Sequence, residues 1–260
     1  MADSSILGRF LWYELLTSDM KGAEQFYKPV VGWTVTPFEG NPEPYDMWTR
    51  PDGKPMGGVM KLPQGMNVPP HWGMYVGVPN LEEGVKAVEK LGGSWMSPVI
   101  DVPQVGRMRT MKDPQGAMFS IYEPLNPPQE PEGEPKVCDA SWHELYTTDA
   151  EAAMKFYTTL FGWQTLDAMD MGEMGKYHMF NRPHGMIGGM MNQPPEMAHV
   201  PPNWQVYFLV PDITAAVERI KSNGGTIVNG PMEVPGGDWV VNAMDPQGAA
   251  FALHARAVNV

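Results

Sequence analysis

The stretch "WYELLTSDMKGAEQFYKPVVGW" (Trp12–Trp33) returns as "WHELYTTDAEAAMKFYTTLFGW" (Trp142–Trp163), with Trp, Glu, Leu, Thr, Asp, Phe, Tyr, Gly and Trp at the same spacing. Further along, "PPHWGMYVGVPN" matches "PPNWQVYFLVPD", and "KDPQGAMFSIY" matches "MDPQGAAFALH". Self-similarity on this scale indicates a duplicated domain. We therefore expect two domains of one fold, at residues 1–124 and 138–260, joined by a Pro- and Glu-rich linker at 125–137.

Each half also repeats a smaller plan of a strand, a helix and about three strands. A strand at Phe10–Leu16, or at Ser141–Thr147, leads to an Asp that can cap a helix, and a Gly marks the helix end. Later in each half a second strand leads to a helix capped by Asn80 or Asp212. The closing hairpin turns at "DPQG", which has the residue preferences of a type I turn. The plan thus occurs four times in the chain.

This quadruple pattern, with "FY…GW" ending the first helix and "DPxG" before the last strand, resembles the vicinal oxygen chelate superfamily. Its members include glyoxalase I, bleomycin-resistance proteins and extradiol dioxygenases. The chain is also similar to a tandem-domain actinobacterial branch, labelled glyoxalase-like or hydroxylase, that carries W-x-(D/E)-L-x-T at each domain start. The resemblance implies an α+β fold of four βαβββ modules in two tandem domains, each with a cupped, incomplete mixed β-barrel. Both known arrangements stay open: modules paired within each half, or exchanged across the linker.

Composition narrows the range of partners. The net charge of −12 and the pI near 4.9 argue against nucleic acid and against anionic membranes, because both repel an acidic surface. No apolar run approaches the roughly 20 residues that a membrane-spanning helix needs, and no signal peptide is visible. Cys138 is the only cysteine, so neither an intramolecular disulfide nor a thiolate metal cluster can form. We expect a cytoplasmic protein, monomeric or homodimeric, with a small-molecule ligand.

The resemblance also implies a metal site in each cup, and the matching positions can be checked residue by residue. They hold Trp12 and Trp142 on the first strand, Gly73 and Gln205 on the strand that opens the second module, and Ser120 and Ala252 on the last strand. The fourth-strand segments, "MGGVMKL" and "MIGGMMN", contain no carboxylate. Transition metals need three or four imidazole, thiolate or carboxylate donors. We expect no metal and no cofactor, with an atypical divalent metal as the alternative.

Strand alternation places other side chains on the cup face. The predicted ligand-binding residues are Trp12, Glu14, Tyr75, Tyr122, Trp142, Gln205 and Tyr207. Glu144 with His254 is the predicted catalytic pair, since a carboxylate near an imidazole can perform general acid–base chemistry. The alternatives are structural: the glutamates bond backbone groups, and His254 is a hydrogen-bonded residue of the last strand. The first-strand tryptophans are either core residues or a wall against which a planar ligand stacks.

Three functions follow from these residues. The first is a metal-independent protein that binds or sequesters a planar apolar compound, as bleomycin-resistance proteins bind their drug. The second is a glyoxalase-like lyase or isomerase that uses Glu144 with His254, or an atypical metal. The third is a protein-interaction module with vestigial clefts. In the third hypothesis the Met-rich surface binds the partner. The 22 methionines otherwise serve as flexible, polarizable filler, which suits irregular pockets and surfaces that meet varied ligands.

Overall fold

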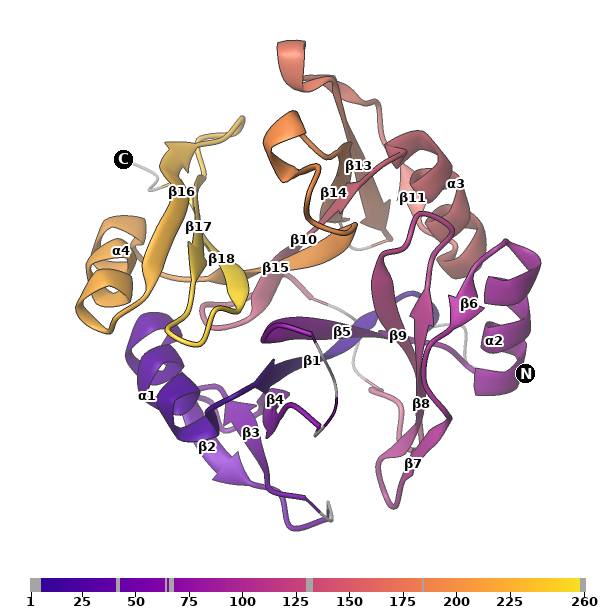
Figure 1. Cartoon of the computed structure of the whole chain (residues 1–260), viewed down its shortest axis with the longest axis horizontal. Helices are drawn as coiled ribbons and strands as arrows, with labels where there is room; N and C mark the ends of the chain where they lie inside the picture. Colours follow the sequence, from indigo (N-terminus) through magenta and orange to yellow (C-terminus); the bar gives the residue numbers. More distant parts are fainter. Residues whose placement is uncertain are drawn as a thin grey trace. The chain divides into compact units, whose positions relative to one another are not determined.

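The strand–helix–strands plan is found in all four quarters of the chain (Figure 1). The computed structural model describes residues 6–40, 43–63, 65, 68–129, 133–183 and 185–257, so residues 130–132 of the predicted linker lie outside the described residues. The first half contains β1 (Phe10–Thr17), α1 (Met20–Val31), β2 (Thr34–Pro37), β3 (Tyr45–Thr49), β4 (Pro55–Lys61), β5 (His71–Gly77), α2 (Leu81–Lys90), β6 (Ser94–Trp95), β7 (Ile100–Val102), β8 (Gly106–Lys112) and β9 (Met118–Pro124).

The second half repeats this order. It contains β10 (Ala140–Thr147), α3 (Ala150–Phe161), β11 (Gln164–Thr165), β12 (Met169–Asp170), β13 (Lys176–Arg182), β14 (Gly185–Asn192), β15 (Asn203–Leu209), α4 (Ile213–Ser222), β16 (Thr226–Glu233), β17 (Trp239–Met244) and β18 (Ala250–Ala255), with 3-10 turns at Gly172–Met174 and Pro195–Met197. The second and third quarters each have one strand more than the sequence predicts, because β7 pairs with β8 and β12 pairs with β13.

The predicted helix starts and stops are confirmed. The helices α1 to α4 are capped by Asp19, Asn80, Asp149 and Asp212. In each cap a side-chain oxygen accepts a hydrogen bond, 2.9–3.1 Å long, from the backbone N–H three residues later. These bonds satisfy N–H groups that the first helical turn leaves without partners. Gly32 and Gly162 end α1 and α3 in the left-handed conformation, which glycine adopts at no steric cost.

Each half forms one mixed sheet. The strand order is β2-β3-β4-β1-β5-β9-β8-β6 in the first half and β11-β13-β14-β10-β15-β18-β17-β16 in the second. In both, the first strand of each module runs parallel to the last strand of that module, and the hairpins are antiparallel. The two modules of a half therefore share a sheet. The α+β class, with four βαβββ modules in two tandem domains, is confirmed.

Packing divides the chain differently from strand pairing. Unit 1 consists of the described residues of Met1–Trp12, Gly73–Glu134 and His143–Trp204, and in it α2 packs against α3. Unit 2 consists of those of Tyr13–Trp72, Pro135–Trp142 and Gln205–Val260, and in it α1 packs against α4. Each unit thus combines one module from each half.

In unit 2 the Tyr of "FY" from the first half binds the Asp of "DPQG" from the second half. The hydroxyl of Tyr27 donates to Asp245 Oδ2 at 3.1 Å and accepts from Trp72 Nε1 at 3.0 Å, and all three residues are buried. Burial, and then the charge of Asp245, raise the pKa of Tyr27 well above its usual value. Burial also raises the pKa of Asp245, although hydrogen bonds to the carboxylate oppose this.

Unit 1 contains the reciprocal network. Tyr157 donates to Asp113 Oδ2 at 3.0 Å and accepts from Trp204 Nε1 at 3.0 Å. Burial raises the pKa of both Tyr157 and Asp113 here as well. The two most recognisable motifs of the repeat therefore meet across the halves, one pair in each unit.

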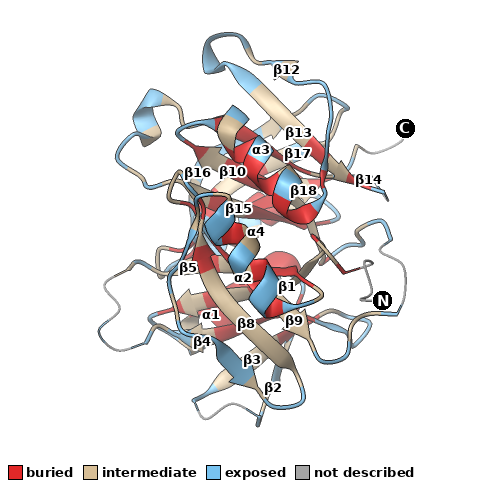
Figure 2. Ribbon diagram, turned by 90° about the vertical axis from the view of Figure 1, so that its right-hand side faces the viewer, coloured by how far each residue is buried: buried red, intermediate tan, exposed pale blue. Residues whose placement is uncertain are grey.

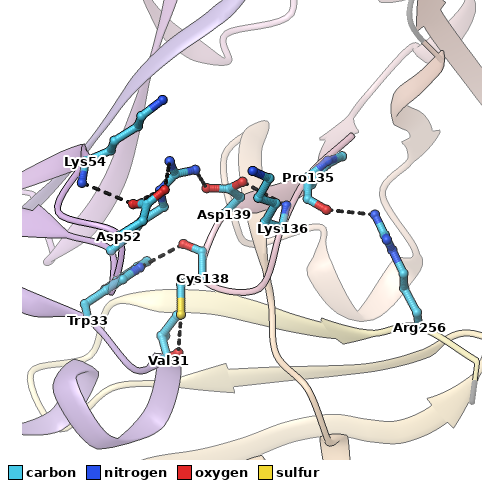
Figure 3. Close-up of polar contacts among 10 residues, drawn as sticks. Val31, Trp33, Asp52, Lys54, Pro135, Lys136, Cys138, Asp139 and Arg256 are labelled. Carbon is cyan, nitrogen blue, oxygen red and sulfur yellow. Dashed lines mark hydrogen bonds and ion pairs between the residues drawn. The ribbon is translucent and has the colours of Figure 1, made fainter. Parts of the chain in front are cut away.

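The Trp at the end of each repeated stretch hydrogen-bonds to the backbone near the start of the other half. Trp33 Nε1 donates to the carbonyl of Cys138 at 2.8 Å in unit 2, and Trp163 Nε1 donates to the carbonyl of Gly8 at 2.8 Å in unit 1. Figure 3 shows the first of these contacts, together with the Cys138 thiol, 3.2 Å from the carbonyl of Val31. The stretch that recurs in the sequence therefore connects the halves as well as forming a helix in each.

Candidate functional site

The first strand of the first half has one buried face and one less buried face. Figure 2 colours the ribbon of both halves by burial. On β1, Tyr13, Leu15 and Thr17 are buried, whereas the alternate residues Trp12 and Glu14 are half-buried. Since neighbouring side chains of a strand point to opposite sides, Trp12 and Glu14 share a face. On β10 the alternation is incomplete: Trp142 is half-buried, but Glu144, on the same face, is buried at 7% exposed, as are its neighbours His143 and Leu145.

A glycine and a tyrosine complete this face in the first half. Glu14 pairs in register with Gly58 of β4, and a Cβ on Gly58 would lie 2.0 Å from the hydroxyl of Tyr45. Residues paired across strands point to the same side of a sheet, so the phenol of Tyr45 covers the strand beside Glu14. A residue larger than glycine at position 58 would displace the ring.

The second half has the same arrangement with one addition. Glu144 pairs with Gly189 of β14, and a Cβ on Gly189 would lie 2.3 Å from the hydroxyl of Tyr177. Tyr146, two residues beyond Glu144, donates its hydroxyl to Glu144 Oε2 at 2.6 Å. The matching residue in the first half is Leu16, so this hydrogen bond belongs to the second half alone.

The donors present on these faces do not fit a divalent transition metal. The first-strand ligand positions carry indole rings, and beside Glu14 and Glu144 the fourth strand carries glycines covered by tyrosine rings. Such metals need several imidazole, thiolate or carboxylate donors converging on one point. Within the part of the chain that the structure describes, no group of three His, Cys, Asp or Glu side chains could hold a metal ion.

His254 forms the centre of a hydrogen-bonded row in unit 2. Its Nδ1 lies 2.9 Å from Ser141 Oγ, and its Nε2 lies 2.8 Å from Asp238 Oδ2. Burial raises the pKa of Asp238, but hydrogen bonds from the Ala257 N–H and from His254 outweigh it, and the net shift is downward. Both ring nitrogens of His254 are therefore engaged, and the orientation of the imidazole is fixed.

The other predicted site residues have defined neighbours. Gln205 Nε2 donates to Asn242 Oδ1 at 2.8 Å, and Tyr122 donates its hydroxyl to the carbonyl of Val105 at 3.1 Å. Tyr75 and Tyr207 are buried, at 9% and 5% exposed. They pair in register with Ser120 and Ala252, so they share a face with these two residues, which stand at the last-strand positions where the superfamily carries a metal ligand.

The predicted residues are divided between the two units. Unit 1 contains Trp12, Tyr75, Tyr122 and Glu144, and unit 2 contains Glu14, Trp142, Gln205, Tyr207 and His254. The Glu144–His254 pair is therefore split between the units and stays a prediction. Sequence reasoning missed Asp238, which binds His254, and the tyrosines Tyr45 and Tyr177. The two tyrosines recur in the repeat, as "YDMWT" and "YHMFN", and that signal could have found them.

His143 lies on the buried side of β10, away from Glu144. It is 5% exposed, and its ring stacks on Phe10 with centroids 3.6 Å apart and planes 7° apart. Its Nδ1 lies 2.7 Å from the carbonyl of Ile187. Burial lowers the pKa of His143 from 6.5 to about 4, so the ring is neutral at physiological pH.

Comparison with known proteins identifies the family. Residues 140–253 match the model of the glyoxalase/bleomycin resistance protein/dioxygenase superfamily, and residues 14–122 match the model of the glyoxalase-like domain. The chain belongs to this superfamily. Full-length relatives of this glyoxalase-like chain include the putative glyoxylase CFP32 of Mycobacterium tuberculosis, 29% identical over 93% of this chain and 92% of the relative. Another is the anthracycline biosynthesis protein DnrV of Streptomyces peucetius, 29% identical over 93% and 91% of the two chains.

Solved structures of the superfamily share the fold at low identity. The 2,3-dioxygenase LapB of Pseudomonas sp. KL28 has a TM-score of 0.65 and 13% identity, over 97% of this chain and 94% of its own. The Mn(II)-bound glyoxalase of Novosphingobium aromaticivorans has a TM-score of 0.66 and 14% identity, over 97% and 83% of the two chains. No helix among the described residues is long and apolar enough to cross a membrane.

Proposed function

We propose that this glyoxalase-like protein binds or sequesters a planar aromatic small molecule without a metal ion, on the faces that carry Trp12 and Trp142. The observation that carries the proposal is the pair of glycines, Gly58 and Gly189, each covered by a tyrosine ring. A metal-binding member of the superfamily needs a ligand side chain on this strand. Here the space is occupied by an aromatic ring, so the face is better suited to stacking than to coordination.

Methionines support the same proposal. In both halves a Met pairs in register with the glycine, and a second Met pairs with the tyrosine; the four are Met47, Met60, Met179 and Met191. Thioether side chains are flexible and polarizable, and they adapt to the outline of an aromatic ligand. The name of the Streptomyces relative adds support, since anthracyclines contain a planar fused-ring system.

The test is a fluorescence titration of chelator-treated protein with acridine, a neutral planar compound. We expect quenching of Trp emission, and about two- to tenfold weaker binding by Trp12→Ala or Trp142→Ala, the effect of one stacking contact. Trp95→Ala is the control, because Trp95 is 51% exposed on β6. Melting curves of each variant distinguish a tryptophan that stacks on the ligand, whose loss leaves the fold stable, from a core tryptophan, whose loss destabilises it. Absence of acridine binding, or unfolding of Trp142→Ala, would refute the proposal.

A second candidate is proton-transfer catalysis as a lyase or isomerase, favoured by the row Ser141–His254–Asp238. A carboxylate that orients an imidazole is a common arrangement for a general base. The test is whether protein treated with a chelator converts the methylglyoxal–glutathione hemithioacetal to its thioester. The variant His254→Gln should abolish this conversion. The interaction module with vestigial clefts, a cytoplasmic location and a monomeric or homodimeric state stay predictions from the sequence.

A further inference from the structure

Each half places a carboxylate on its first strand beside aromatic and thioether side chains of the neighbouring hairpin. In unit 2, Glu14 lies beside Tyr45, Met47 and Met60, all half-buried. In unit 1, Glu144 lies beside Tyr177 and Met179, which are half-buried, and Met191, which is 8% exposed. The two sets occupy equivalent positions in the repeat, so the chain carries the same face twice.

A carboxylate on such a face favours one class of ligand over others. Taking an anion out of water is costly, and a ligand that brings positive charge offsets this cost better than a neutral one. Tyrosine and tryptophan rings attract cations through their negative faces, and this attraction grows when water is excluded. The protein's net charge of −12 also concentrates cations near the surface and repels anions.

We infer that the ligand is a planar aromatic cation, a fused ring bearing a protonated nitrogen, and that each chain binds two molecules of it. The nitrogen pairs with Glu14 at one face and with Glu144 at the other, while the ring lies against the neighbouring tyrosine and methionines. Tyr146 holds the carboxylate of Glu144 in place through its 2.6 Å hydrogen bond. This inference rests on the proposed function and adds the charge and the stoichiometry of the ligand.

The experiment compares three acridines of one shape on the full chain: 9-aminoacridine, a cation at neutral pH, acridine, which is neutral, and acridine-9-carboxylate, an anion. We expect 9-aminoacridine to bind at least about tenfold more tightly than acridine, two per chain, with the preference shrinking at high salt. Glu14→Gln and Glu144→Gln should each remove the preference at one site, and the double variant should bind cation and neutral ring equally.

Glu218→Gln is the matched control, since Glu218 is an exposed residue of α4 paired with Lys221. It should leave all three affinities unchanged, and melting curves should show that every variant is folded. Equal binding of 9-aminoacridine and acridine would overturn the inference while the proposed function survives. A cation preference that persists in the double variant would also overturn it. If none of the three rings binds, the proposed function fails as well.

Discussion

Removing the hydroxyl of Tyr27 should destabilise the protein far more than an ordinary Tyr→Phe change. The hydroxyl donates to the buried carboxylate of Asp245 and accepts from Trp72 Nε1, so Tyr27→Phe breaks two hydrogen bonds and leaves an indole N–H buried without a partner. A hydrogen bond to a charged group contributes about 1.5–3 kcal/mol, and an unsatisfied buried donor costs about 1–3 kcal/mol. We expect a loss of about 3–5 kcal/mol in the free energy of unfolding.

Urea denaturation at neutral pH measures this loss, and Tyr122→Phe is the control. Tyr122 donates to the carbonyl of Val105, a neutral acceptor, so its loss should cost about 1 kcal/mol. The Tyr27 bond lowers the pKa of Asp245, and its removal lets that pKa rise further, so the penalty should shrink as Asp245 becomes protonated in acid. A Tyr27→Phe loss no larger than that of Tyr122→Phe would refute the cross-half network.

Three further outcomes are expected. First, His143 is neutral in the fold and protonates in the unfolded chain, so it should contribute a loss of about 3 kcal/mol in stability as the pH drops from 6.5 to 4. The raised pKa values of Asp113 and Asp245 act in the opposite direction in wild type and in His143→Phe alike, so the His143 contribution is the difference between the two pH profiles. An identical pH profile for the variant would contradict us. Second, Gly189→Ala should displace Tyr177, because its Cβ would lie 2.3 Å from the Tyr177 hydroxyl, and acridine binding at the second-half face should weaken by about tenfold. The control is Gly133→Ala, which should have no effect because a Cβ at Gly133 would have nothing within 4 Å. Third, fragments 1–134 and 135–260 should fold poorly alone and regain helix and sheet, by circular dichroism, when mixed; two separately stable halves would contradict the cross-half networks.

The fold could be predicted well from the sequence because its helix ends and turns depend on residues close together in the chain. Helix caps at Asp19, Asn80, Asp149 and Asp212, and the turns at DPQG, depend on residues near one another in the chain. The repeat itself predicted the number of modules. The short strands β7 and β12 were missed because two or three residues carry no periodic signal.

The site was predictable only in part, since it depends on strand register. Alternation puts Trp12 with Glu14, and Trp142 with Glu144, on one side of their strands; Trp12, Glu14 and Trp142 are half-buried, but Glu144 is buried, and the roles of these residues stay predictions. It could not show that Tyr45 and Tyr177 reach across from β3 and β13 to cover a glycine, because that contact is set by tertiary pairing. The same holds for Asp238, which meets His254 only through the pairing of β17 with β18.

The central claim is that ligand binding needs no metal ion, and one titration tests it. Protein stripped with a chelator, shown by elemental analysis to be metal-free, is titrated with 9-aminoacridine before and after reloading with Zn²⁺, Mn²⁺ or Fe²⁺. We expect the same affinity and the same Trp quenching in every case. Binding that appears only after reloading, with about one metal ion retained per chain or per half, would contradict the account.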